Sequence, residues 1–429
     1  MSISKSENTL AERPTATVTG EQTKQPSGIR RRLERWLERD RWPSPEDTVA
    51  LFTARLTDVG ANRTARTWAE RYLAADEEQR RKYLAGLVEA SDQIEDRGDD
   101  GLRLYRRLYA QAESLQLLVQ LRADMLRWRN QVAGLTLLER ELQTVLSNWF
   151  DVGMLELRRI SWDCPASLLE KLIEYEAVHK IRSWEDLRNR VADHRRCFAF
   201  FHPRMPHEPL IFVEVAFTNQ MADNVQTLLD PYGPEEDPDK ARWAIFYSIS
   251  NTQRGLRGIS FGNFLLKRVV EELLQEFPRL KGFATLSPIP GFNQWLSKCS
   301  QDDLLAYLEK SERKLVEADA MNGLDWLKKL QDSGIEHVAD DFRKATLRLV
   351  GKYLKSTKNG VPIDPVARFH LGNGARIEQL NWGANVSEQG LQQSCGVMAN
   401  YLYDLDQLDD NLAQLATGKI KTGRPLRWL

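Results

Sequence analysis

The sequence predicts a multidomain α+β protein, with an all-helical bundle followed by a mixed α/β domain that carries a helical insertion. Three observations predict this fold class. Apolar residues follow a helical spacing almost throughout residues 29–190. Short aromatic and β-branched runs, which are typical of strands, begin near Cys197. Helical spacing then returns over about residues 300–358, inside the α/β region. A chain of 429 residues also exceeds the size of one ordinary hydrophobic core.

The composition argues against several classes of protein. With 60 Lys and Arg against 61 Asp and Glu, the chain does not have the charge of a nucleic-acid binder. Its apolar runs are shorter than the roughly 18–20 residues of a membrane span. Its 4 cysteines are widely spaced and form no C-x-x-C pair, which disfavours a zinc site and a disulfide scaffold. We therefore expect a cytoplasmic protein with free thiols, no metal, no nucleic-acid partner and no membrane partner.

The first part of the chain predicts a tail and then a helical domain. Residues 1–28 are polar and lack a targeting signal, so we expect a disordered tail. Residues 29–190 predict a helical bundle whose role is packing or oligomerisation. Ser44, Pro45 and Asp47 form a helix start, and Gly60 is the expected stop. The apolar residues spaced for this first helix are Leu51, Phe52, Leu56 and Val59. Further helices are expected over residues 64–75, 77–91 and 102–146.

The second part, residues 191–429, predicts the α/β domain. Strands are expected over residues 197–201, 210–217, 242–248 and 282–286, and a helix over residues 262–277. Three prolines within residues 202–209 predict a connection there, because proline does not fit a central strand.

The helical insertion, residues 300–358, is expected to pack against this α/β core. Its helices are predicted over residues 304–316, 323–331 and 338–354. Short strands and a last helical region follow within residues 377–382 and 391–401.

A loop over residues 250–261 (SNTQRGLRGISF), between a predicted strand and helix, is a candidate phosphate site. Glycines at 255, 258 and 262 let a pyrophosphate approach the backbone, and Arg254 and Arg257 add donors. An ordinary glycine-containing turn with solvated arginines explains the same residues.

Two single residues are candidates for chemistry. Ser287 follows a predicted strand in the proline-rich segment LSPIPG, which holds its hydroxyl at the mouth of a domain. A turn or cap residue is the alternative, and no G-x-S-x-G nucleophile elbow surrounds it. His370, one of 6 histidines, precedes a Gly-Asn-Gly turn and is expected at a strand end. Its titration range suits proton chemistry, while a hydrogen-bonded core histidine is the alternative. No H-x-x-x-H or H-E-x-x-H is present, which disfavours a metal site.

Residues 246–292 (FYSISNTQRGLRGISFGNFLLKRVVEELLQEFPRLKGFATLSPIPGF) closely resemble the catalytic domain of malonyl-CoA decarboxylases. Four further segments share this resemblance, in the same order and at the family's spacing. They are residues 202–217 (HPRMPHEPLIFVEVAF), 369–374 (FHLGNG), 381–387 (NWGANVS) and 394–401 (SCGVMANY). The helical first half matches the family's layout more loosely.

The resemblance implies a catalytic domain like the GNAT acetyltransferase fold, in which coenzyme A binds at a strand–loop–helix junction. The acetyltransferase signature Arg/Gln-x-x-Gly-x-Gly/Ala aligns with residues 257–262, with Ser260 in place of the first glycine. The residues that would hold the pyrophosphate and pantetheine are Arg257, Gly258, Ile259, Ser260, Phe261, Gly262 and Asn263. The family's catalytic serine and histidine fall on Ser287 and His370, and a tyrosine near the site falls on Tyr403, in a region expected to be helical.

The resemblance also implies an activity. Malonyl-CoA would be converted to acetyl-CoA and CO₂ through an enolate, without a cofactor, by a Ser-His pair. Both malonate breakdown and the control of malonyl-CoA for fatty-acid synthesis fit this reaction. A homotetramer built as a dimer of dimers is expected, as in the family. Three alternatives stay open at this point: an acyltransferase, a non-catalytic acyl-CoA sensor or scaffold, and a thioesterase that uses Ser287 and His370.

Overall fold

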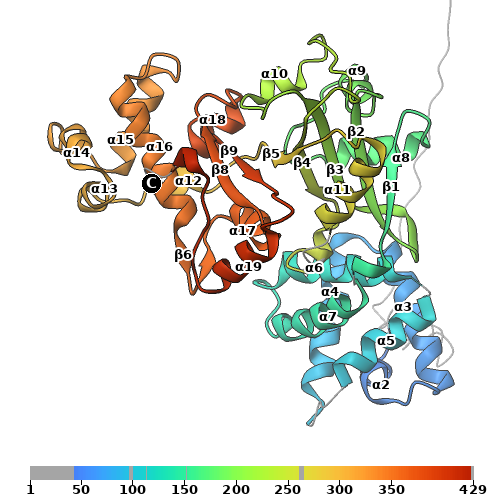
Figure 1. Cartoon of the computed structure of the whole chain (residues 1–429). Coiled ribbons are helices and arrows are strands. Elements are labelled where there is room, and N and C mark those ends of the chain that lie inside the picture. The colour runs from blue at the N-terminus through green and yellow to red at the C-terminus, as the bar shows by residue number, and fades with distance from the viewer. Residues whose placement is uncertain (1–42, 96–99, 113, 151, 260–264, 427–429) are drawn as a thin grey trace, which may run out of the picture.

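The computed structural model describes residues 43–95, 100–112, 114–150, 152–259 and 265–426. The predicted tail, residues 1–28, lies outside the described residues, as do Ser260, Phe261, Gly262 and Asn263 of the predicted coenzyme A loop. Figure 1 shows a helical region, a central sheet and a second group of helices on the far side of the sheet. No helix of the described residues is long and apolar enough to cross a membrane.

Between residues 43 and 150, the described part of the chain forms six helices. They are α2 (Pro45–Thr53), α3 (Val59–Ala74), α4 (Glu77–Asp92), α5 (Asp100–Ala112), α6 (Leu115–Trp128) and α7 (Leu135–Trp149). A capping box between Ser44 and Asp47 starts α2, as predicted. The predicted end of this helix is wrong, because α2 ends at Thr53, Asp58 caps α3 and Gly60 lies inside α3. Val59 is 79% exposed, so the apolar spacing does not continue into a buried face.

A seven-stranded mixed sheet follows, in the order β1-β2-β3-β4-β5-β9-β8. The strands are β1 (Glu156–Ile160), β2 (Arg195–His202), β3 (Met205–Thr218), β4 (Trp243–Asn251), β5 (Gly282–Thr285), β8 (Arg376–Asn381) and β9 (Met398–Leu402). All neighbouring strands are antiparallel except β4 and β5, which are parallel. The prediction of helix up to residue 190 is therefore wrong for β1, which pairs with β2 at the edge of the sheet.

Two short helices between β1 and β2 belong to this sheet and not to the helical bundle. They are α8 (Ala166–Tyr175) and α9 (Trp184–Arg190). Leu169, Leu172 and Leu187 share one buried cluster with residues of β2 and β3. The sheet domain thus begins near residue 156, earlier than the predicted residue 191, because β1 needs its partner strand β2 to form.

The hairpin of β2 and β3 corrects another prediction. Residues 202–209 were expected to form a connection, but β3 begins at Met205 and includes Pro206 and Pro209. β4 pairs with β3 only from Ile211 onward, so this end of β3 has one neighbouring strand. The β2–β3 register also shifts on both sides of Phe201. Both features are settings in which a strand tolerates proline.

Helices cover the sheet and form the insertion. The helices are α10 (Val225–Leu229), α11 (Leu265–Glu276), α12 (Phe292–Leu296), α13 (Gln301–Tyr307), α14 (Lys310–Glu317), α15 (Gly323–Ser333), α16 (Asp340–Lys355), α17 (Pro365–Gly372), α18 (Glu388–Ser394) and α19 (Leu408–Ala416). The insertion between β5 and β8 is helical, as predicted. Its first predicted helix is divided into α13 and α14 by an extended residue, Leu308. A two-stranded hairpin, β6 (Thr357–Lys358) and β7 (Val361–Pro362), precedes α17.

The last helical region, predicted within residues 391–401, is confirmed only as far as Ser394. α18 ends at Ser394, because Cys395 and Gly396 adopt the left-handed conformation that ends helices, with φ of 51° and 76°. The chain then enters strand β9. The predicted order of a helical region, a mixed α/β domain and a helical insertion is otherwise confirmed.

Candidate active site

The two parallel strands at the centre of the sheet separate, and Ser287 lies where they part. β4 pairs with β5 only from Trp243 to Phe246, and Leu286 makes the last backbone bond to Phe246. Ser287 then exchanges two backbone hydrogen bonds with Ala399 of β9, both of 2.9 Å. The chain has therefore left β4 at this residue, and prolines at 288 and 290 keep it from returning to the sheet.

His370 lies on α17 and not at the end of a strand, which corrects the prediction. Asp364 caps this helix and Pro365 occupies its first position, which is a common start signal for a helix. The ring is 4% exposed. Its Nε2 lies 3.1 Å from Ser287 Oγ, although the two residues are 83 positions apart. The structure thus brings the predicted pair together.

Tyr403 completes a line of side chains. It directly follows β9, where a helix was predicted, and its backbone N–H donates to the carbonyl of Phe283. The Tyr403 hydroxyl lies 2.8 Å from His370 Nδ1. The ring of Tyr401 stacks on the imidazole, with centroids 4.6 Å apart. Both imidazole nitrogens therefore have a hydroxyl partner, and the ring is held from one face.

The hydrogen bonds assign a direction to this line. Ser287 Oγ donates to Thr285 Oγ1 at 2.8 Å, so its own lone pairs are free to accept from His370 Nε2–H. Nδ1 of a neutral imidazole then accepts from the hydroxyl of Tyr403. In this arrangement His370 is a donor toward Ser287, whereas a hydrolase would need His370 to take the proton of the serine.

Burial controls the protonation of the site. It lowers the pKa of His370 to about 3, so the imidazole is neutral at physiological pH. Burial also raises the pKa of Tyr403, which keeps its hydroxyl protonated. The site therefore contains neutral donors and acceptors and no fixed charge on these three side chains.

A cavity of about 210 Å³ opens beside Ser287 and His370. Its residues come from β4, from the segment that follows β5, from α17 and from the segment before α9. They are Val178, Phe246, Tyr247, Ile249, Asn251, Ser287, Pro288, Pro365, Val366, Phe369 and His370. The cavity has room for a small acyl group, since a water molecule occupies about 30 Å³ in the liquid. Its walls are mostly apolar, and Asn251 adds an amide.

Sequence reasoning missed several of these residues. Asn251 lies in the segment that was interpreted as a phosphate loop, and Thr285 lies two positions before Ser287. Both residues were therefore close to a sequence motif. Val178 had no such motif, because it lies far from Ser287 in the sequence, in a segment that the carboxylate of Glu176 contacts. That carboxylate accepts the backbone N–H groups of Val178 and His179, at 2.9 and 2.6 Å. It also accepts from Ser248 of β4.

The described part of the predicted coenzyme A loop lies beyond the end of β4. A short 3-10 helix, η2 (Arg254–Leu256), precedes Arg257, and Gly258 has a φ of +78°, which suits glycine. Ile259 is buried. Arg257, Gly258 and Ile259 do not line the cavity of Ser287, so the loop and the reacting pair are separate parts of the site.

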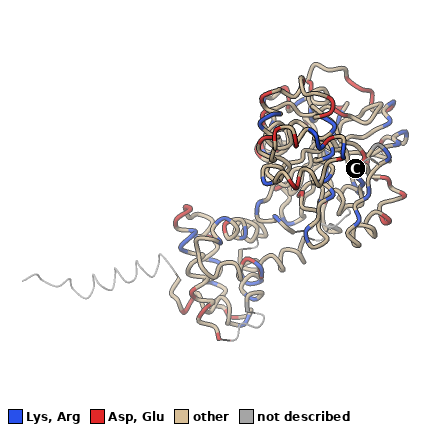
Figure 2. Tube along the Cα trace, turned by 90° about the vertical axis from the view of Figure 1, so that its left-hand side faces the viewer, with Lys and Arg blue, Asp and Glu red and all other residues tan. Residues whose placement is uncertain are grey.

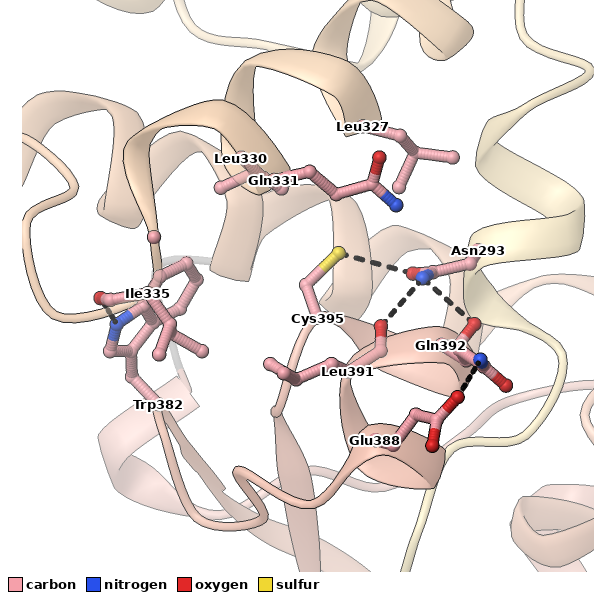
Figure 3. Close-up of a pocket in the computed structure, with 11 residues that line it drawn as sticks. Asn293, Leu327, Leu330, Gln331, Ile335, Trp382, Glu388, Leu391, Gln392 and Cys395 are labelled. Carbon is pink, nitrogen blue, oxygen red and sulfur yellow. Dashed lines mark hydrogen bonds between the residues drawn. The ribbon is translucent and has the colours of Figure 1, made fainter.

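A second cavity, of about 290 Å³, lies away from these residues. Figure 3 shows it between α12, α15 and α18, with Leu327, Ile335 and Leu391 on its walls. Asn293 of α12 connects these elements, because its amide donates to the carbonyls of Leu391 and Gln392. The side chains that bear a predicted role do not line this cavity.

Comparison with known families matches nearly all of the described chain. The family model for the malonyl-CoA decarboxylase C-terminal domain matches residues 153–428, and the model for the N-terminal domain of the same family matches residues 67–150. The chain belongs to the malonyl-CoA decarboxylase family. The two matches meet where α7 ends and the segment leading to β1 begins, which agrees with a sheet domain that includes β1.

Individual members of the malonyl-CoA decarboxylase family are also similar over most of their length. The mitochondrial malonyl-CoA decarboxylase of Rattus norvegicus is 39% identical over 350 residues, which are 75% of this chain and 70% of the relative. The crystal structure of the Cupriavidus metallidurans malonyl-CoA decarboxylase is 48% identical, with a TM-score of 0.80, and the match covers 91% of this chain and 98% of that one. The Rhodopseudomonas palustris structure is 35% identical, with a TM-score of 0.74, covering 90% and 100%.

Proposed function

We propose that this protein is a malonyl-CoA decarboxylase, which converts malonyl-CoA and a proton into acetyl-CoA and CO₂. One observation carries the proposal beyond family membership. Ser287 and His370, from different elements, lie 3.1 Å apart at a cavity between the separated central strands. This arrangement supports a reaction at the acyl end of a thioester.

The substrate itself provides the electron sink for this reaction. When the bond to the β-carboxylate breaks, its electron pair moves into the thioester carbonyl and forms the enolate of acetyl-CoA. A proton added to carbon then completes the product. Because the carbonyl accepts the electrons, we propose that no organic cofactor or metal takes part. The protein must orient the carboxylate out of the carbonyl plane, stabilise the enolate oxygen and direct the proton.

We assign these tasks to the line of three side chains. His370 supplies a hydrogen bond or proton through Ser287, which accepts from its Nε2–H, as charge develops on the enolate. Tyr403 holds the imidazole tautomer through Nδ1. Ser287 orients the malonyl group or relays the proton to carbon. Its hydroxyl already donates to Thr285, which favours this role over that of a covalent nucleophile.

The remainder of malonyl-CoA is proposed to lie along the loop after β4. The residues proposed to hold it there are Arg257, Gly258, Ile259 and the residues up to Asn263. The loop lies past the end of β4, which lines the cavity with Phe246, Tyr247, Ile249 and Asn251. A pantetheine chain bound along β4 would connect the two parts of the site.

Incubation with malonyl-CoA alone tests the proposed function. We expect acetyl-CoA and CO₂ in equal amounts, measured by chromatography and by release of labelled CO₂. An acyltransferase would release no CO₂ without an acceptor, and a thioesterase would produce malonate and free thiol. Binding without any product would indicate a sensor or scaffold. Each of these three results would overturn the proposal.

A further inference from the structure

The loop after β4 is held by a buried ion pair of the helical region. Arg122 of α6 is 2% exposed and pairs with Glu139 of α7 at 2.9 Å. Its Nη1 also donates to the backbone carbonyls of Gly255 and Arg257, at 2.6 and 2.9 Å. The guanidinium thus connects two helices with a loop more than 130 positions further along the chain. Figure 1 shows α6 beside the yellow-green segment that follows β4.

The backbone at this contact leaves no room for a side chain. A Cβ at Gly255 would lie 1.8 Å from the carbonyl oxygen of Val119 on α6. The glycine therefore allows η2 to approach the helix closely enough for Arg122 to reach both carbonyls. Further along the loop, the side-chain amide of Gln143 on α7 donates to the carbonyl of Gly258 at 3.4 Å.

These bonds set the direction of the peptide groups in this loop. In a trans peptide the carbonyl and the N–H point to opposite sides, and the described chain has no cis peptide bond. Because the carbonyl of Arg257 points at Arg122, the N–H of Gly258 points away from Arg122. A backbone N–H held in this way is a suitable donor to a phosphate oxygen.

We propose that Arg122 and Glu139 are positioning residues of the coenzyme A site, which orient the loop at residues 255–258 for the pyrophosphate. This inference rests on the proposed function. It gives the N-terminal helices a part in substrate binding, although none of their side chains lines the cavity of Ser287. Arg122 directs its donors to protein carbonyls and acts on the substrate only through the loop.

The variant Arg122→Lys tests the inference, since lysine keeps the charge but loses the planar fork that reaches two carbonyls and a carboxylate together. We expect KM for malonyl-CoA to rise about tenfold or more, as for the loss of a charge-assisted hydrogen bond. We expect kcat to change less than about threefold, because the reacting residues are untouched. Malonyl-pantetheine, which lacks the pyrophosphate, should show the same KM with both proteins.

Arg107→Lys is the matched control. Arg107 is 1% exposed and also donates to backbone carbonyls, including those of Ala50 and Arg55, but its partners among the described residues lie in the helical region. It should lower thermal stability without raising KM. An equal rise of KM in both variants would overturn the inference, because general loosening of the helices would then explain it. An unchanged KM in Arg122→Lys would overturn it as well.

Gly255→Ala provides a second test that leaves the ion pair intact. The added methyl group should push the loop off α6 and raise KM for malonyl-CoA but not for malonyl-pantetheine. Gly86→Ala on α4, where a Cβ meets nothing within 4 Å, should leave both unchanged. If Arg122→Lys does not fold, this pair of variants decides the question. Absence of decarboxylation by the wild-type protein would instead reject the proposed function.

Discussion

At the scale of single residues, the site depends on Ser287, whose backbone and hydroxyl make hydrogen bonds with different partners. Its backbone pairs with Ala399, which fixes its position in the sheet. Its hydroxyl is left to join Thr285 and His370. Structure and chemistry are thus carried by different atoms of the same residue, so the hydroxyl can be removed without removing the strand contact.

Ser287→Ala and His370→Asn should therefore lower kcat with little effect on the fold. We expect a decrease of about 10²- to 10⁴-fold for each, the usual contribution of positioned proton-transfer groups. Steady-state assays with malonyl-CoA and circular dichroism measure the two properties. Ser297→Ala, at an exposed hydroxyl that donates to the carbonyl of Gln294, serves as a control. Near wild-type turnover in folded Ser287→Ala and His370→Asn would remove both residues from the mechanism.

The buried imidazole also predicts a dependence of stability on pH. The folded pKa of His370 is about 3 and the ordinary value is 6.5, so between these values only the unfolded chain binds the proton. The stability that this group contributes is complete above pH 6.5 and is lost as pH falls toward 3. From pH 8 to pH 5 the loss is about 2 kcal/mol.

Urea denaturation at several pH values measures this effect. The wild-type free energy of unfolding should fall more steeply below pH 6.5 than that of His370→Asn. Parallel curves for the two proteins would contradict the assignment of a neutral, buried His370. His179, whose pKa burial lowers to about 4, is unchanged in both proteins and affects both curves equally.

At the scale of elements, helix α17 presents the histidine to the sheet. Asp364 starts this helix, because one carboxylate oxygen accepts the N–H groups of Val366 and Ala367, at 2.9 and 2.8 Å. The other oxygen accepts from the hydroxyl of Tyr353 on α16 at 3.1 Å. A single buried carboxylate therefore fixes the start of α17 and connects it to the helical insertion. The orientation of His370, less than two turns later, depends on it.

Asp364→Ala should destabilise the protein by about 1–3 kcal/mol, through the lost cap and the unpaired tyrosine hydroxyl. It should also lower kcat, since α17 would no longer hold His370 against Ser287. Asp364→Asn keeps an oxygen acceptor for the cap and should lose less of both. Thermal denaturation and turnover measure the pair of variants. Equal values for Asp364→Ala and the wild type would contradict this role of the cap.

At the scale of the whole molecule, the net charge is close to zero, and charged side chains of both signs are evenly distributed. Figure 2 shows Lys and Arg interspersed with Asp and Glu along the described chain. The helical region also leaves some apolar side chains exposed. They include Leu56, Val59, Leu73 and Leu137. Such residues on a region that the sequence assigns to packing or oligomerisation are candidates for contacts between copies of the chain.

We predict a homotetramer, as the family resemblance implies. Sedimentation velocity over a wide range of protein concentrations should show a tetramer, with a dimer as the dissociation product. Val59→Lys, at the most exposed of these residues, should shift the distribution toward smaller species if the helical region forms a contact. A monomer at every concentration would contradict the prediction.

Local signals in the sequence determined most helices, the strands of the sheet and the nature of the insertion. Capping residues such as Ser44 and runs such as residues 197–201 act within a few positions, so they could be read without the fold. Local sequence patterns led to wrong predictions where a neighbouring strand decides the structure. β1 forms because β2 pairs with it, and β3 tolerates two prolines because β4 does not extend beside them.

The sequence by itself also determined the family and the candidate residues Ser287, His370 and Tyr403, because each lies in or near a motif that the family shares. Only the tertiary structure decided how they meet. His370 reaches Ser287 from a helix, and Tyr403 reaches His370 from the end of a strand. The cavity arises where β4 and β5 separate, and Arg122 reaches the loop from another region of the chain. These contacts join residues far apart in sequence, so their geometry depends on the packing of whole elements and not on local spacing.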